Sequence, residues 1–413
     1  MFRTRSLETH IDLDVILMPQ SSADNAAGPP LPGTRSAVLP ARLENYRFSL
    51  GEQEVPYFFG YSCRTAMGEL LAERFAGRGA VLMLIDGGVQ RHARDLLGSL
   101  DRNVKVVPVT IDPNEQRKSL SLVGSLLERA VAEKIGRDAV VVAMGGGVVG
   151  NVAGMVAALL YRGLPLVHLP TTPVAAFDAV LSAKQAVNLT QGKNLCGTFL
   201  APSLIACDLA WLSTVPPHML ATGIVEMAKN VLAVRPADAD RLTGAVPLID
   251  TDPELALRTF LDIGVKAKIP FIEADPKEKA AALIFEYGHT VGHAIEFASR
   301  GLISHGEAVG WGMLAAASIA TRLCGLSPAD ERRHHELLAG FGLSRGRLSA
   351  VDRRAVTELL SKDNKRGYLK TDGETVAMVL LDALGSPVTA DGRPLIGVPR
   401  ALVESAIDEL HTD

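Results

Sequence analysis

The first regular pattern in the chain begins at Tyr46, where apolar residues start to recur with the spacings of strands and helices. Short runs rich in Val, Leu and Ile alternate with longer stretches in which apolar residues recur every three to four positions. The short runs predict buried strands, and the longer stretches predict amphipathic helices. This alternation is typical of a parallel sheet covered by helices on both faces. Strands with turns are expected over 47–60, further strands at 81–86, 104–111 and 139–144, and helices at 66–77, 92–100 and 119–135.

A glycine-rich turn follows the strand predicted at 139–144. Residues 145–151, GGGVVGN, match the pattern G-x-G-x-x-G and lead into a helix of small residues over 152–160. In this setting backbone N–H groups and the helix N-terminus can hold a diphosphate, although glycines that only permit close strand–helix packing explain the same pattern. The ribose-binding acid expected about 20 residues later is missing, because no Asp or Glu lies between Asn151 and Asp178. Asp86, at the end of an earlier strand, could supply that carboxylate instead.

The segment 163–212 is strand-like at both ends and polar in the middle. Two lysines and two asparagines gather in this middle part: Lys184, Asn188, Lys193 and Asn194. A solvated loop explains scattered lysines, whereas Lys and Asn together in a glycine-bearing loop more often bind phosphate or hydroxyl groups. The GKN sequence is not a P-loop, because no Ser or Thr follows the lysine.

After Pro216-Pro217 the pattern becomes helical to near the end of the chain. Over 218–234, Glu226 and Lys229 fall on one face among apolar residues. An exposed charge pair at this spacing is the ordinary interpretation. The apolar setting makes a ligand or a buried ion pair an equally good one.

The densest group of chemically active side chains lies in the segment 285–307. His289 and His293 stand four residues apart, so both rings project from one side of a helix, and His305 follows a short loop. The zincin pattern is absent, because Thr290 follows the first histidine. Three glutamates share the segment: Glu286, Glu296 and Glu307. A single histidine is more often a core or capping residue, but the group indicates a metal or catalytic site.

Composition narrows the class of protein. A chain of 413 residues with 47% apolar residues predicts two domains. The net charge of -4, from 42 basic and 46 acidic residues, disfavours a nucleic-acid partner. Four cysteines without C-x-x-C spacing indicate a reducing compartment. No apolar run is long enough to span a membrane, so we expect a soluble cytoplasmic protein.

Residues 1–40 are rich in Ser, Gly, Pro and Ala. They predict a mobile N-terminal extension.

Taken in order, the motifs GGGVVGN, PTT, KQAVN, GKN, GIVEMAKN, GHTVGHAIE and SHGEAV resemble the sugar phosphate cyclases, the superfamily of 3-dehydroquinate synthase. The resemblance runs from about Tyr46 to the C-terminus. It implies an α/β, Rossmann-like domain that binds NAD, over 41–215. A mainly α-helical domain that binds a divalent metal, Co or Zn, and the substrate would follow over 216–413. The active site would lie in the cleft between them, and homodimers are usual in the superfamily.

Two positions separate this chain from the dehydroquinate synthases. Their pattern G-L-R-x-L-L-N-x-G-H carries an Arg where this chain has Ala282, and an Asn where it has Glu286. Without that Arg the site lacks the fork that binds a carboxylate through two hydrogen bonds. The chain is instead similar to the branch of the superfamily that makes 2-deoxy-scyllo-inosose from glucose 6-phosphate in aminoglycoside biosynthesis. Four segments carry this similarity: EYGHTVGHA, LSAKQAVNLTQGKN, GNVAG and DNKRGY.

This resemblance implies transient oxidation of the sugar by NAD, elimination of phosphate, reduction and intramolecular aldol closure. The alternatives are another sugar phosphate cyclase, an NAD- and metal-dependent alcohol dehydrogenase, or a homologue that has lost its metal.

The resemblance also assigns roles to individual residues. The metal ligands would be Glu226, His289 and His305, and the catalytic groups Lys184, Glu278, Glu286 and His293. Substrate contacts would come from Asp178, Asn194, Lys229 and Lys365. Contacts to NAD would come from Asp86, Glu115, Gln116, Arg117, Lys118, Gly147, Val148, Val149, Gly150, Asn151, Thr171, Thr172, Ser182, Ala183 and Lys193. Relatives often have Tyr where this chain has Arg117.

Overall fold

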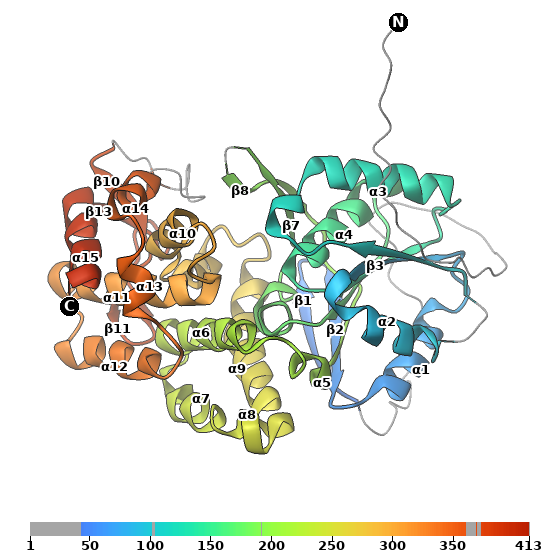
Figure 1. Ribbon diagram of the computed structural model, residues 1–413, viewed down its shortest axis with the longest axis horizontal. Coiled ribbons are helices and arrows are strands. Elements are labelled where there is room, and N and C mark those ends of the chain that lie inside the picture. Colours follow the sequence, from blue (N-terminus) through green and yellow to red (C-terminus); the bar gives the residue numbers. More distant parts are fainter. Residues whose placement is uncertain (1–42, 101–103, 191, 361–368, 370–372, 413) are drawn as a thin grey trace, which may run out of the picture.

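A seven-stranded sheet forms one half of the molecule in the computed structural model (Figure 1). The structure describes all residues except 1–42, 101–103, 191, 361–368, 370–372 and 413. The predicted N-terminal extension and Lys365 therefore lie outside the described residues. The strand order is β1-β2-β9-β6-β5-β3-β4, with β1 and β2 antiparallel and every later neighbour pair parallel. The strands are β1 (Glu44–Leu50), β2 (Gln53–Gly60), β3 (Val81–Asp86), β4 (Val106–Ile111), β5 (Val140–Gly145), β6 (Leu166–Pro170) and β9 (Leu204–Asp208).

Helices cover both faces of this sheet because its strands are apolar on both sides. In β3, Met83 packs into the core shared with α1 and α2, whereas Leu84 packs into the core shared with α3 and α4. Every residue of β3 and β5 is buried, which explains their unbroken apolar runs. The helices of this half are α1 (Arg64–Phe75), α2 (Gln90–Leu97), α3 (Leu120–Ala132), α4 (Gly147–Leu159) and α5 (Leu209–Leu212). The strands and helices predicted up to residue 160 are thus confirmed.

The polar segment after β6 forms an antiparallel hairpin, so the expectation of a loop there is wrong. Its strands are β7 (Lys184–Leu189) and β8 (Gly192–Phe199). Gln185 and Val187 are buried, whereas Lys184, Ala186 and Asn188 on the other face are exposed or half-buried, a two-residue alternation that the clustered Lys and Asn residues obscured.

The second half of the molecule is mainly helical. Its helices are α6 (Pro217–Ala233), α7 (Ala239–Ala245), α8 (Leu248–Thr251), α9 (Pro253–Ala274), α10 (His289–Ala298), α11 (His305–Leu323), α12 (Pro328–Ala339), α13 (Arg345–Ser349), α14 (Arg353–Leu359) and α15 (Arg400–Thr412). Two small ribbons near the end depart from the expected helical pattern: β10 (Thr375–Met378) with β13 (Ile396–Pro399), and β11 (Leu381–Ala383) with β12 (Ser386–Pro387). None of the described helices combines the length and apolarity needed to cross a membrane.

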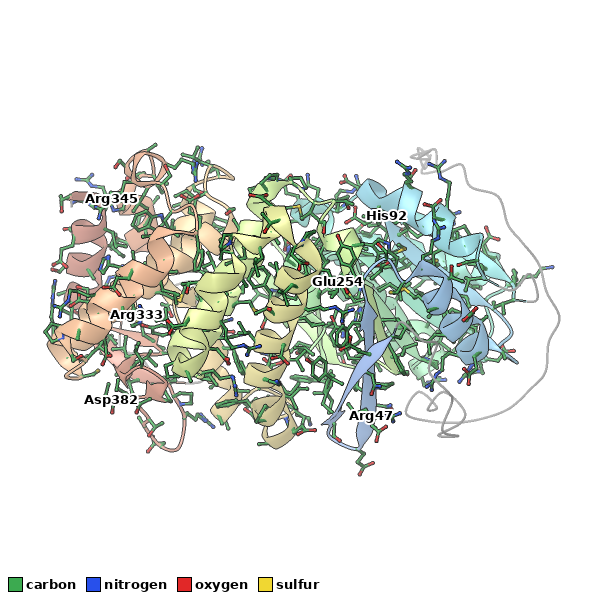
Figure 2. The ribbon with its side chains drawn as sticks, turned by 90° about the horizontal axis from the view of Figure 1, so that it is seen from below. Arg47, His92, Glu254, Arg333, Arg345 and Asp382 are labelled. Atoms are coloured by element: carbon green, nitrogen blue, oxygen red, sulfur yellow. The ribbon has the colours of Figure 1, made fainter. Side chains whose placement is uncertain are left out.

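The long helices α6 and α9 lie between the sheet and the remaining helices. Figure 2 shows them in green and yellow, with Glu254 of α9 near the centre, Arg47 and His92 on the sheet side, and Arg333, Arg345 and Asp382 on the other. Residues of α6 and α9 share one continuous apolar core with both β1–β2 and α11. The two halves are therefore packed together through these helices.

Glycines bring α10 and α11 unusually close together. A Cβ on Gly312 of α11 would lie 1.9 Å from the carbonyl oxygen of Gly288 and 2.7 Å from the backbone nitrogen of Gly292. Gly288, which precedes α10, has a φ of +76°, a conformation that side chains rarely adopt. This backbone contact fixes the start of α10 against α11.

Candidate active site

The predicted metal ligands converge from three helices. Glu226 lies in α6, His289 is the first residue of α10, and His305 is the first residue of α11. Oε1 of Glu226 is 3.3 Å from Nε2 of His305 and 3.8 Å from Nε2 of His289. Ligand atoms around a tetrahedral zinc lie about 3.3 Å apart, given metal–ligand bonds of about 2.0–2.1 Å. The spacing therefore fits a divalent cation held by one carboxylate and two imidazoles.

Hydrogen bonds at Nδ1 turn both rings toward Glu226. Nδ1–H of His289 donates to the carbonyl oxygen of Tyr287 at 3.0 Å, and Nδ1–H of His305 donates to Oε2 of Glu296 at 3.0 Å. Each bond leaves Nε2 to face the shared carboxylate. A partner at the second ring nitrogen is what orients histidine ligands in metal sites.

The buried carboxylate of Glu226 requires a cation nearby to balance its charge. Its side chain is 1% exposed, and among the described residues neither oxygen has a hydrogen bond of good geometry. Nζ of Lys229, one turn later, lies 2.6 Å from Oε2. Buried charge of this kind is costly unless it is paired or bound to a metal. The exposed-pair interpretation of Glu226 and Lys229 is therefore wrong, and the donor set fits a divalent metal.

The charges around Glu226 keep it ionised. Burial alone would raise the pKa of this carboxyl, but Lys229 and the two histidines hold it well below its ordinary value. Burial would likewise lower the pKa of His305, but Glu226 and Glu296 raise it to about 10. The two carboxylates that favour a proton on this ring also favour a metal cation.

A second buried ion pair lies next to the first. Nζ of Lys268, in α9, donates to Oδ1 of Asp178 at 2.9 Å and to the carbonyl oxygen of Asp178 at 3.0 Å. Asp178 belongs to a short π-helix, η4 (Ala175–Ala179), a conformation frequent at functional sites. Nζ of Lys229 and of Lys268 both lie within 6 Å of the Phe285 ring centre, at 5.8 and 5.6 Å. Two cations thus lie beside Phe285, and one of them, Lys229, contacts the predicted metal ligand Glu226.

Lys268 was not among the residues predicted from the sequence. Its side chain is 5% exposed. The residue lies on the face of α9 that buries Leu261, Gly264 and Ile272. A lysine at an apolar position of this helical pattern was the available signal.

Lys184 and Glu278 meet across the boundary between the halves. Nζ of Lys184, the first residue of β7, is 2.8 Å from Oε2 of Glu278. Ser182 donates from Oγ to the other oxygen of Glu278 and accepts the backbone N–H of Lys184 at 3.1 Å. Glu278 has a φ of +49°, a costly conformation for a residue with a side chain. The structure thus brings together three residues expected to bind cofactor or to act in catalysis.

Glu286 and His293 lie beside the same cluster. Glu286 ends the 3₁₀ segment η6 (Ala281–Glu286). Burial lowers the pKa of His289, and the charge of Glu286 partly opposes this shift. The pKa of Lys229 is raised because Glu226, with a smaller contribution from Glu286, outweighs burial. The ring centre of His293 is 5.1 Å from that of His289 and 5.8 Å from that of His305. His293, Glu296 and His305 also come close enough to hold an ion. That second group fits less well, because Glu296 already binds His305 and pairs with Lys193.

The glycine-rich turn stands at the end of β5 beside Asp86. Oδ1 of Asp86 accepts the backbone N–H of Gly88 at 2.8 Å, and burial raises the pKa of its carboxyl. A Cβ on Gly145 would lie 2.9 Å from the Cβ atoms of Asp86 and Val149. Close packing therefore explains why residue 145 is a glycine. It does not explain Gly147, the first residue of α4, because nothing lies within 4 Å of a Cβ at that position. Gly147 leaves backbone N–H groups at that helix start open to a ligand.

Asn151 links α4 to the hairpin. Its Oδ1 accepts the backbone N–H of Ala186 at 2.8 Å, and its Nδ2 donates to the carbonyl oxygen of Gly147 at 2.9 Å. Both polar atoms of the Asn151 side chain therefore have hydrogen-bond partners within the protein. This indicates a structural role in addition to the predicted contact with NAD. The glycine-rich turn and Lys184 line one small pocket. Its lining includes Gly145, Gly146, Gly147, Gly150, Asn151, His168 and Lys184.

The far end of the hairpin packs on the short helix η2 (Glu115–Arg117). Nδ2 of Asn188 donates to Oε1 of Glu115 at 2.8 Å, and Lys118 donates from Nζ to Oδ1 of Asn194. Lys118 is 5% exposed and Asn194 has a φ of +56°. The remaining residues predicted to contact NAD lie within or beside this group and the glycine turn: Gln116 and Arg117 in η2, Val148, Val149 and Gly150 in α4, Thr171 and Thr172 after β6, and Ala183 before β7.

A cleft of about 1600 Å³ opens beside the cluster. Glu115, Gln116 and Lys193 line it from the sheet half, and Glu296 and His305 line it from the helical half. Residues predicted for cofactor and for metal therefore face one space. The individual roles of these residues stay predictions.

Comparisons with known proteins agree with this fold. Residues 108–222 match the 3-dehydroquinate synthase N-terminal family, and residues 223–366 match the 3-dehydroquinate synthase C-terminal family. A 2-deoxy-scyllo-inosose synthase of Streptomyces lividus is 41% identical over 364 residues, which cover 88% of this chain and 94% of the relative.

Two solved structures extend the comparison. A crystal structure of 2-deoxy-scyllo-inosose synthase complexed with carbaglucose-6-phosphate, NAD+ and Co2+ has a TM-score of 0.79 and 34% identity, covering 89% of this chain and all of that one (100%). The fold is shared with a 2-epi-5-epi-valiolone synthase of Streptomyces hygroscopicus subsp. jinggangensis with NAD+ and Zn2+ bound, at a TM-score of 0.72 and 23% identity, covering 87% and 97% of the two chains.

The fold and these relatives therefore define a sugar phosphate cyclase of the 3-dehydroquinate synthase superfamily. Within that superfamily, the chain belongs to the 2-deoxy-scyllo-inosose synthases.

Proposed function

We propose that this protein is a carbon–oxygen lyase, dependent on NAD and a divalent metal, that converts D-glucose 6-phosphate to 2-deoxy-scyllo-inosose and inorganic phosphate. The observation that carries the proposal is the convergence of Glu226, His289 and His305, with Nε2–Oε1 distances of 3.3 and 3.8 Å, beside a cleft that the sheet half also lines. The structural relative bound to carbaglucose-6-phosphate, NAD+ and Co2+ supports the same ligands here.

When bound, NAD takes up and returns a hydride, and a divalent cation polarises the hydroxyl that is oxidised. Lys184 and Glu278 place a charged donor and a carboxylate where protons move during oxidation and elimination. Glu286 stands close enough to Lys229 and His289 to affect their pKa values and is a candidate acid–base group. Lys229 and Lys268 supply positive charge for the sugar phosphate and for developing oxyanions.

Ala282 supports glucose 6-phosphate over the acidic precursor of dehydroquinate. Its side chain is a buried methyl group, so this position provides no cation for a substrate carboxylate. A phosphorylated sugar without a carboxylate needs none.

The test incubates purified protein with NAD, Co²⁺ and one of three compounds: glucose 6-phosphate, sedoheptulose 7-phosphate or the dehydroquinate precursor. Inorganic phosphate should appear with glucose 6-phosphate and not with the other two. Preference for another compound would overturn the substrate assignment. Net accumulation of NADH would indicate an alcohol dehydrogenase. Undiminished phosphate release in Glu286→Gln would contradict the role of that residue.

Three further expectations belong to this proposal. The boundary between domains is placed at residues 215–216, just before α6. The protein is expected to work in the cytoplasm as a homodimer, which sedimentation velocity would test.

A further inference from the structure

Glu296, near the end of α10, contacts both halves of the molecule with its two carboxylate oxygens. Oε2 accepts Nδ1–H of His305 at 3.0 Å, and Oε1 accepts Nζ of Lys193 at 2.7 Å. Lys193 lies on β8 in the sheet half, whereas His305 begins α11 in the helical half. Polar contacts therefore run in sequence from Lys193 through Glu296 and His305 to Glu226.

His305 depends on a side chain for its orientation, and His289 does not. The ring of His289 is held by the carbonyl oxygen of Tyr287, two residues earlier in the same backbone. The ring of His305 is 32% exposed and is held at Nδ1 by Glu296 from another helix. Loss of that acceptor would free the ring to rotate, and Nε2 would no longer be directed at Glu226.

Lys193 in turn fixes the carboxylate of Glu296. The hairpin that carries Lys193 is tied to η2 through Asn188, whose Oδ1 also accepts the backbone N–H of Asn194 at 2.9 Å. The side chains of Lys193 and Glu296 are 38% and 18% exposed, so the pair lies at the edge of the cleft. A lysine has three N–H donors, and one bond to Glu296 leaves two for a cofactor.

We propose that Glu296 is a positioning residue that orients His305 for the divalent cation, and that Lys193 strengthens this orientation from the opposite half. Cation affinity then depends on a lysine that is not a ligand. The inference rests on the proposed function only in requiring a divalent cation at Glu226, His289 and His305.

The test measures Co²⁺ affinity by calorimetry, and ligand geometry by the visible absorption of bound Co²⁺, without NAD or substrate. Glu296→Ala should weaken Co²⁺ binding by about 10- to 100-fold and change the absorption bands, as loss of a partner to a histidine ligand does. Glu296→Gln keeps an oxygen acceptor and should recover part of this loss. Lys193→Ala should weaken binding roughly two- to fivefold, the range of a partly exposed ion pair.

The double variant separates the two contributions. Lys193→Ala should have no further effect when Glu296 is already Ala, because its action passes through that carboxylate. Glu254→Gln is the matched acidic control, since the Glu254 carboxylate pairs with Arg258 one turn later in α9. Lys266→Ala is the matched basic control, since Lys266 pairs with Asp262 on the surface. Both controls should keep the parent affinity for Co²⁺.

The possible results distinguish failure of the proposed function from failure of the positioning role of Glu296 or Lys193. If the parent protein fails to bind Co²⁺, the proposed function fails. If the parent binds Co²⁺ and folded Glu296→Ala binds it equally well, only this inference is overturned. An equal effect of Lys193→Ala in both backgrounds overturns the contribution of Lys193. If Glu296→Ala does not fold, Glu296→Gln and Lys193→Ala provide the same cycle.

Discussion

Nζ of Lys184 and Oε2 of Glu278 lie 2.8 Å apart, although one residue begins β7 of the sheet half and the other follows α9 of the helical half. Glu278 is 7% exposed at its side chain, and Ser182 holds its second oxygen. The carboxylate is therefore fixed in one position relative to Lys184.

Glu278→Gln should lower phosphate release from glucose 6-phosphate by roughly 100-fold or more, the usual contribution of a positioned acid–base group. The amide is nearly the same size but can neither carry the charge that pairs with Lys184 nor take up a proton. A phosphate assay under single-turnover conditions would measure the effect. Release within threefold of the parent rate would exclude a part for this carboxylate in the chemistry.

The buried pair of Glu226 and Lys229 predicts strongly non-additive effects on stability. Glu226→Gln and Lys229→Met should each lower the free energy of unfolding by about 3–5 kcal/mol, because each leaves the other charge buried without its partner. The double variant should be destabilised by much less than the sum. Urea unfolding in the presence of a chelator measures this without a contribution from metal binding. Additive losses would show that the two charges do not depend on each other.

His168 in β6 predicts acid sensitivity. It is 4% exposed, and burial lowers its pKa from 6.5 to about 4. Between these two values the unfolded chain binds a proton that the folded chain does not, so the free energy of unfolding falls as the pH is lowered. The shift corresponds to about 3 kcal/mol, lost between pH 6.5 and 4.

His168→Gln should remove this dependence. Denaturant unfolding at a series of pH values would show the parent losing about 3 kcal/mol more than the variant between pH 6.5 and 4. Above pH 7 the difference between the two proteins should be constant. Parallel curves throughout the acid range would mean that His168 is protonated in the folded protein.

Substitution of Gly312 should disturb the packing of α10 against α11 and thereby the predicted metal ligand His289. A Cβ there would lie 1.9 Å from the carbonyl oxygen of Gly288, and backbone atoms cannot move aside as a flexible side chain can. Gly312→Ala should lower the free energy of unfolding by about 1–3 kcal/mol, the cost of overpacking. It should also weaken Co²⁺ binding by displacing α10, and with it His289, from α11.

Gly124→Ala is the matched control for this substitution. Gly124 lies inside α3, and nothing is within 4 Å of an added Cβ. Alanine should therefore stabilise the protein by about 0.5–1 kcal/mol, because it favours helix. Thermal unfolding of both variants distinguishes helix propensity from the α10–α11 contact. Stabilisation by both substitutions would contradict the close approach of the two helices.

Much of the fold could be predicted because the strands are buried on both faces. Runs such as 81–86 and 139–144 are apolar at nearly every position. They could therefore be recognised as strands without knowing which face of the sheet each residue occupies. The hairpin β7–β8 was harder, because six of the eight β8 residues carry small or polar side chains and contribute little apolar signal. The ribbons near the C-terminus pair segments as far apart as Thr375 and Pro399, a contact that local patterns do not report.

The candidate site could likewise be predicted only in part. His289 and His293 were identified from helical spacing, but this spacing does not show which of them binds a metal or that the distant Glu226 joins them. Glu226 lies 63 positions before His289 in the chain, and the packing of α11 against both α6 and α10 brings the three predicted ligands together. The resemblance to a family supplied what spacing could not. Lys268 went unnoticed because a single buried lysine on a long helix differs little in sequence from an exposed one.

The two histidines at the centre of the site are also the residues with which α10 and α11 begin. Each helix start carries about half a positive elementary charge from its aligned peptide dipoles. The start of α11 borders the cleft through Ser304 and His305, so the electrostatic potential at this edge is raised before any lysine is considered. This edge of the cleft is thereby predisposed to anions, and a phosphorylated sugar meets attraction there from the backbone itself.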